Sequence, residues 1–200
     1  MHKEQIAELL YQAYETEQGG EKIYEIAIKC AENEDLREEW EKYLDQTREH
    51  VQIVREAMEV FGLDPDLETP GRLVVRHIGE SLVAAIQMAL DSGVPGAAQS
   101  VACECVVLAE TKDHLNWELI GMCGEKLKGD EGKALKDAHG KVEDQEDEHL
   151  YHTTGWCREL WVDSLGMPAQ LPPPEEEKDV KTAIGAARAK AQRKTKSTKS

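Results

Sequence analysis

The sequence of 200 residues has few aromatic side chains, no paired cysteine motif and no long apolar run. Its five cysteines are an odd number without a Cys-x-x-Cys pair, which disfavours a disulfide framework and favours reduced thiols. A membrane-spanning helix needs about 20 consecutive apolar residues, so the absence of such a run predicts no membrane span. The N-terminal MHKEQIAELL lacks the apolar stretch of a secretory signal, and we therefore expect a cytoplasmic protein.

Basic residues are scarce except at the C-terminus. The 24 bases face 40 acids, a net charge of −16, yet residues 181–200 carry seven bases and no acid. We expect residues 1–171 to form one helical domain and residues 172–200, which begin with a Pro/Glu-rich linker, to form a flexible basic tail. The acidic domain should repel nucleic acid and attract cations. The tail either contacts nucleic acid without sequence specificity or only solubilises the chain.

No segment shows the apolar alternation of a β-strand, whereas apolar residues recur at helical spacing almost throughout. The pattern predicts helices over residues 3–32, 35–61, 71–91, 96–127 and 131–165. Short, long and short connections then predict an all-α fold, a four-helix bundle of two hairpins joined by a long crossover that contains the shorter helix.

The two halves of the chain resemble each other. DQTREHV at 45–51 matches DQEDEHL at 144–150, and TEQGGEKIYEIAIKC at 16–30 matches AETKDHLNWELIGMC at 109–123 more weakly. These matches indicate a duplicated helical hairpin. The duplication places five polar groups on the apolar stripes of the helices: Glu17, His50, Glu110, Glu146 and His149.

Burying unpaired carboxylates costs several kcal/mol, so these five groups need compensating partners. A metal ion that accepts both carboxylate and imidazole ligands provides this compensation. Glu146 and His149 lie three residues apart on one helix face and are able to bind the same ion.

With this pattern the chain resembles the ferritin-like superfamily of di-iron and di-manganese carboxylate proteins, which includes rubrerythrins and manganese catalases. The family pattern is one Glu from each of two helices and a Glu-x-x-His from each of the other two. The resemblance implies that Glu17 and Glu110 are the single carboxylates, that Glu146 and His149 are a complete Glu-x-x-His, and that His50 is the second histidine. It also implies iron or manganese as the cofactor.

The chain departs from the family in two respects. Thr47 stands where the second Glu-x-x-His has its Glu, a carboxylate that usually bridges the metals in the family, so the site is either altered or degraded. Glu49 points away from this stripe and is no substitute, whereas His114 and Glu21 share the faces of Glu110 and Glu17. The chain also lacks the four-cysteine rubredoxin-like module of rubrerythrins.

Two functions remain open at this stage. The first is an oxidoreductase acting on dioxygen, peroxide or ferrous iron, with His114 as an auxiliary ligand or proton donor and Tyr24, beside the expected site, as a redox-active residue. The second is a non-catalytic bundle, structural or stress-related, that keeps the polar cluster as a hydrogen-bond network. A homo-oligomer is compatible with both functions.

Overall fold

The protein is described by a computed structural model in which residues 2–170 and residue 174 are placed. This part of the chain is helical, without strands, and its helices begin and end within two residues of the predicted bounds. The helices are α1 (Lys3–Cys30), α2 (Glu34–Val60), α3 (Pro70–Asp91), α4 (Pro95–Lys126) and α5 (Gly129–Ser164). The predicted linker and basic tail fall almost entirely outside the described residues.

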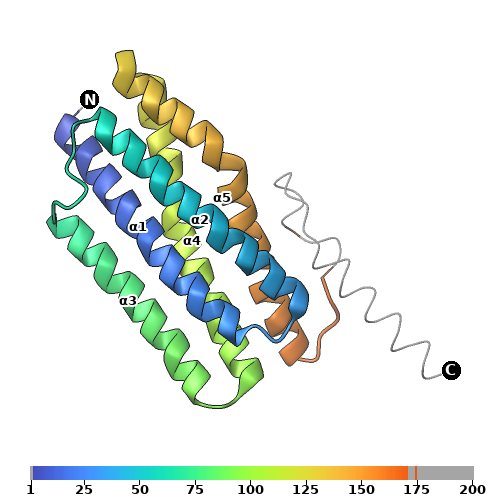
Figure 1. The fold of residues 1–200 in the computed structure, drawn as a ribbon. Coiled ribbons are helices and arrows are strands. Elements are labelled where there is room, and N and C mark those ends of the chain that lie inside the picture. Colours follow the sequence, from blue (N-terminus) through green and yellow to red (C-terminus); the bar gives the residue numbers. More distant parts are fainter. Residues whose placement is uncertain (1, 171–173, 175–200) are drawn as a thin grey trace.

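Four long helices form the bundle and the fifth lies outside it (Figure 1). Helix α1 packs against α2 and α4, and α5 packs against α2 and α4, so that the hairpins α1/α2 and α4/α5 lie side by side. The crossover helix α3 covers α1 and α4. This arrangement confirms the predicted bundle of two hairpins joined by a long crossover.

Two adjacent glycines in α1 permit close helix packing. Helix α1 continues through Gly19 and Gly20 without a break. A Cβ on Gly19 would lie 4.0 Å from the Gly79 Cα of α3, and a Cβ on Gly20 would lie 3.2 Å from the Thr47 Cγ2 of α2. The two glycines therefore let α3 and α2 approach α1 from different sides.

Helix α3 is fastened to α1 by a buried ion pair. Arg72 Nε lies 2.6 Å and Arg76 Nε 2.7 Å from the carboxylate of Glu15, which is itself buried. Helix α3 is nevertheless long and apolar enough to cross a membrane by length and composition, with a mean hydropathy of 1.4 over its best window. Counting uninterrupted apolar runs did not single out this helix, because polar and charged residues such as Arg76 and Glu80 interrupt its apolar residues.

The core consists of two apolar clusters stacked along the bundle. One contains Ile23, Trp40, Val106 and Trp156, and the other contains Leu10, Val54, Ile120 and Leu135, each with further neighbours. On each of the four long helices the residues between these clusters are polar and buried. A polar layer therefore crosses the middle of the bundle.

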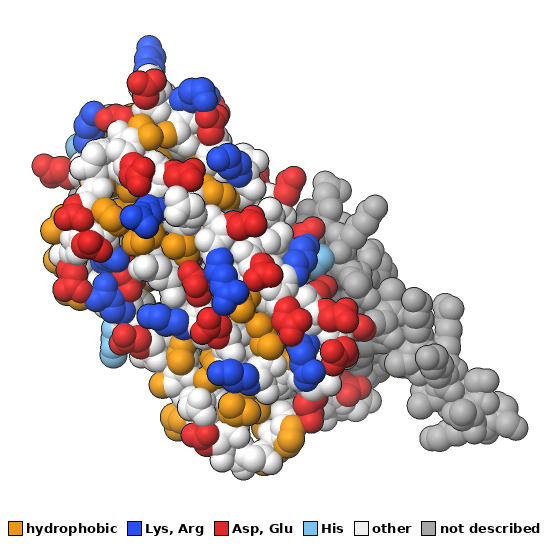
Figure 2. Space-filling model, viewed as in Figure 1, with side chains coloured by type: hydrophobic (Ala, Val, Ile, Leu, Met, Phe, Trp, Pro, Cys, Tyr) orange, Lys and Arg blue, Asp and Glu red, His pale blue; other side chains and the backbone are white. Residues whose placement is uncertain are grey.

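The surface is charged and strongly acidic. On the face in Figure 2, acidic side chains are interspersed with Lys and Arg, and apolar side chains show between them. Several of the exposed apolar side chains belong to α3, among them Leu73, Val74, Ile78 and Met88.

Candidate metal centre

The polar layer brings together the five residues that the sequence singled out. They come from four different helices, and each is at most 3% exposed: Glu17, His50, Glu110, Glu146 and His149. Their helical stripes turn them inward, and the apolar clusters above and below keep them from solvent. The structure therefore contains a buried group of His and Glu side chains able to hold a metal ion.

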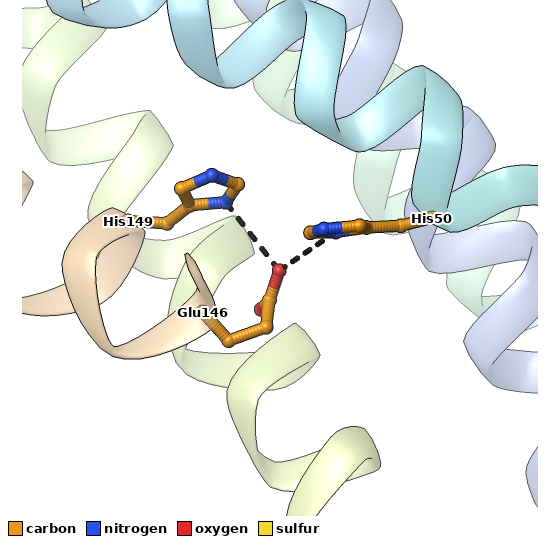
Figure 3. A group of neighbouring side chains, drawn as sticks. All are labelled: His50, Glu146 and His149. Atoms are coloured by element: carbon orange, nitrogen blue, oxygen red, sulfur yellow. Dashed lines mark ion pairs between the residues drawn. The ribbon is translucent and has the colours of Figure 1, made fainter. Parts of the chain in front are cut away.

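Glu146 lies at the centre of this group. Its Oε1 atom is 3.1 Å from His50 Nδ1 and 3.4 Å from His149 Nδ1, so one carboxylate faces both imidazoles (Figure 3). The two imidazole rings are nearly parallel, at 27°, with centroids 5.6 Å apart. Such a carboxylate is suited to contact two adjacent ions.

The other two glutamates lie one beside each histidine. Glu17 Oε1 is 3.6 Å from His50 Nδ1, and Glu110 Oε2 is 3.6 Å from His149 Nδ1. The Trp117 indole Nε1–H donates to Glu17 Oε1 at 2.7 Å and fixes its orientation. Each half of the group therefore offers one histidine and one glutamate of its own, with Glu146 shared between the halves.

Two glutamines orient the histidines across the hairpins. His50 Nε2–H donates to Gln145 Oε1 at 2.8 Å, and His149 Nε2–H donates to Gln46 Oε1 at 3.0 Å. The Gln of each repeated segment thus holds the His of the other. Because Nε2 carries the hydrogen in both rings, Nδ1 is the nitrogen that faces the carboxylates and is available to a metal ion.

A further carboxylate, which the sequence analysis did not single out, belongs to the group. Asp113 of α4 is 5% exposed, and its Oδ1 accepts no hydrogen bond. Carboxylate oxygens of Asp113, Glu17 and Glu146 lie within 4.8 Å of one another. Its position three residues after Glu110 was the signal available in the sequence.

Thr47 occupies the position in the first hairpin that corresponds to Glu146 in the second. It is 3% exposed and lies beside Gly20. The repeat offsets pair Thr47 with Glu146 and Gly20 with Asp113. The first hairpin therefore has neither carboxylate at this level, whereas the second hairpin has both.

The charges in the group are strongly coupled. Burial alone would raise the pKa of Glu146, but the neighbouring imidazoles of His149 and His50 hold it at about 2. Burial lowers the pKa of His50, but Glu146 and Glu17 outweigh this effect and raise it to about 11. His149 is raised in the same way, against the effect of burial, to about 9. Without metal, both imidazoles are therefore protonated at neutral pH.

Two of the other carboxylates hold their protons more strongly than usual. Burial raises the pKa of Glu17 to about 6. Burial also raises the pKa of Asp113 well above its ordinary value, with Glu17, Glu146 and Glu110 adding to the effect. A divalent cation would relieve this repulsion and replace the protons on the imidazoles.

The other candidate residues lie around the group. Tyr24 is fully buried, its hydroxyl makes no hydrogen bond, and burial and the nearby Glu110 raise its pKa well above the ordinary value. His114 turns toward α5, where its Nε2 lies 2.8 Å from Asp147 Oδ1. Glu21 lies 3.9 Å from Arg48, outside the group, and Glu49 is exposed, as expected. The catalytic roles of Tyr24 and His114 stay predictions.

Unsatisfied polar atoms provide a direct test of whether a cation fits. The atoms that neither donate nor accept a hydrogen bond include His50 Nδ1, His149 Nδ1, Glu17 Oε2, Glu110 Oε2, Asp113 Oδ1 and both Glu146 oxygens. Buried polar groups are rarely left without partners. Carboxylate oxygens and imidazole nitrogens are common ligands of iron and manganese, so the donor set fits such an ion.

Comparisons with protein-family models, with curated proteins and with solved structures return no match. The interpretation of the centre therefore rests on its own residues.

Proposed function

We propose that this protein is a ferritin-like metal protein that holds two iron or manganese ions and acts as an oxidoreductase on dioxygen, peroxide or ferrous iron. The observation that carries the proposal is the convergence of two imidazole Nδ1 atoms on the buried Glu146 carboxylate, whose Oε2 atom has no hydrogen-bond partner. Four carboxylates and two imidazoles equal the donor count of the family pattern, with Asp113 in place of the glutamate missing at position 47.

The residues divide into two overlapping half-sites. His50, Glu17 and Asp113 would hold one ion, and His149 and Glu110 would hold the other, with Glu146 shared between them. Bound iron or manganese supplies the electron transfer to the oxidant. Gln46 and Gln145 keep each Nδ1 turned toward the carboxylates.

The surrounding residues control water and protons. The apolar clusters on both sides of the polar layer exclude bulk water, which strengthens every charge interaction inside it. The two Nδ1 atoms carry protons before metal binding and lose them when an ion takes their place. The Tyr24 hydroxyl, beside Glu110, keeps its proton at any physiological pH.

Thr47 favours a second candidate, a non-catalytic bundle in which the polar layer serves only as a buried network. The pairing of both protonated imidazoles with Glu146 would stabilise such a network without metal. The two candidates differ in whether purified protein contains metal.

Elemental analysis of protein expressed with added iron and manganese distinguishes them. We expect about two ions per chain in the wild type and a loss of at least one in His149→Ala. His77→Ala, which removes an exposed histidine of α3, is the matched control and should retain full occupancy. A metal-free wild type under these conditions would establish the non-catalytic bundle instead.

A further inference from the structure

A cleft of about 210 Å³ between α4 and α5 reaches from the surface to the buried centre. Its inner wall is formed by Glu146 and Trp117, which are 1% and 2% exposed. The side chains of His114 and Asp147 are 17% and 37% exposed, and that of Glu143 is 60% exposed. The residues that line the cleft therefore range from exposed to fully buried.

The charges along the cleft suit a cation. The lining contains four carboxylates and two imidazoles and, among the described residues, no Lys or Arg. His114 Nε2 lies 2.8 Å from Asp147 Oδ1, and His139 Nδ1 lies 3.5 Å from Glu143 Oε2. A wider cleft of about 510 Å³ shares Glu118, His139 and Glu143 with it and also contains Lys136, whose Nζ lies 3.0 Å from Glu125 Oε1.

Glu146 provides an independent indication of a ligand at the inner end. Its Oε2 atom is buried and accepts no hydrogen bond, although its side chain forms part of the cleft wall. The His114–Asp147 pair and Glu146 line the same cleft.

At the equivalent positions of the first hairpin, an arginine side chain lies between the acidic residues. The repeat offsets pair His114, Glu118 and Asp147 with Glu21, Glu25 and Arg48. The Arg48 guanidinium lies 3.2 Å from Glu25 and 3.9 Å from Glu21, so it is paired with both acids.

Two apolar residues complete this closure of the first hairpin. Trp40 and Leu44 are buried in the core at the positions that correspond to His139 and Glu143. The open, acidic cleft therefore belongs to the second hairpin.

We propose that the α4/α5 cleft is the entry route by which divalent metal ions reach the buried centre, with the His114–Asp147 pair as a transient binding site. This inference rests on the proposed metal-binding function. An acidic cleft concentrates cations and raises their association rate by about 10- to 1,000-fold. Imidazole and carboxylate side chains then replace the waters of the ion in steps before it reaches Glu146.

The test introduces into the second hairpin the arginine that the first hairpin has at the equivalent position. Metal-free full-length protein is mixed with Co²⁺, and loading is followed by stopped-flow visible absorption. Asp147→Arg places a guanidinium beside Glu118, as Arg48 lies beside Glu25. We expect loading to slow at least about tenfold with the same final Co²⁺ content, since only the route is blocked.

Asp144→Arg is the matched control, because Asp144 is exposed on the same helix, outside the cleft, and the charge change is equal. Its loading rate should stay within about twofold of the wild type. Asp147→Asn, which leaves the helix surface intact, should slow loading by a smaller factor and guards against misfolding of the Arg variant. Equal rates in Asp147→Arg and the wild type, or equal slowing in both Arg variants, would overturn the route while leaving the centre in place. A wild type that binds no Co²⁺ at equilibrium would overturn the proposed function itself.

Discussion

The two hairpins share a plan but differ in where they carry charge. Both supply one Glu, one His and one Gln to the polar layer, and each Gln holds the other hairpin's His. The first hairpin has Gly20 and Thr47 where the second has Asp113 and Glu146. Helix α2 therefore supplies no carboxylate to the polar layer, whereas α4 supplies two. What a buried site requires is a total charge around the ion, and neighbouring helices are able to supply it.

We expect the largest change in metal affinity from removing the carboxylate of Asp113, which the first hairpin lacks. Asp113→Asn should weaken Co²⁺ binding about 100-fold, at the upper end of losses for residues around a metal site. Isothermal titration calorimetry measures the change. An unchanged affinity would show that Asp113 is not a ligand.

Moving the carboxylate back to α2 sharpens the same comparison. Thr47→Glu combined with Asp113→Asn should recover most of the lost affinity, because it returns one carboxylate to the polar layer at the position that the repeat pairs with Glu146. Thr47→Ser with Asp113→Asn adds no carboxylate and is the matched control. Failure of the Glu variant to exceed this control would mean that the two positions are not interchangeable.

The reciprocal glutamines test whether the halves are energetically equivalent. Gln46→Ala and Gln145→Ala each remove one acceptor from a histidine Nε2–H, and each should lower metal affinity about tenfold. Titration of both variants under the same conditions measures the ratio of the two losses. A large effect in one variant alone would show that a single half-site dominates binding.

The pH dependence of the metal-free protein tests the same charges without an ion. Folding raises the pKa values of His50 to about 11 and of His149 to about 9. Their stabilisation is therefore complete below about pH 6.5, the pKa in the unfolded chain, and decreases as pH rises through the folded values. The melting temperature should fall by about 2–4 °C per kcal/mol lost.

Proton NMR or ¹⁵N NMR of the imidazoles follows the same titration residue by residue. His149 should lose its proton before His50, because Glu146 lies closer to His50. In metal-loaded protein the trend of stability should reverse, since fewer protons compete for the ligands as pH rises. A melting temperature that increases with pH without metal would contradict the assigned charge states.

The sequence was sufficient for the bundle and for five of the six His, Glu and Asp residues of the buried group, because each depends on local periodicity. Helical stripes placed Glu17, Glu110 and the two histidines inside, and the repeated DQ-x-x-EH segments aligned the hairpins. The same periodicity could not decide whether Asp113 or His114 points toward the buried group, because both lie near the face of Glu110. Helix α4 packs against both α1 and α5, and this packing turns Asp113 toward the centre and His114 toward Asp147.

Contacts between the hairpins were also beyond the sequence. The crossed Gln–His hydrogen bonds and the role of Arg48 depend on how α2, α5 and their neighbours are arranged in space. The repeat alone indicated that the glutamines correspond to each other, but not that each one binds the opposite histidine. Helix α3 was predicted within one residue, yet its high average hydropathy was overlooked.

The crossed glutamines have a mechanical consequence. Helices α2 and α5 are not joined by a loop, and both hydrogen bonds run between them. Any separation of these helices breaks the two hydrogen bonds together, and both imidazoles then lose their fixed orientation. An ion bound at this level would therefore hold the two hairpins together.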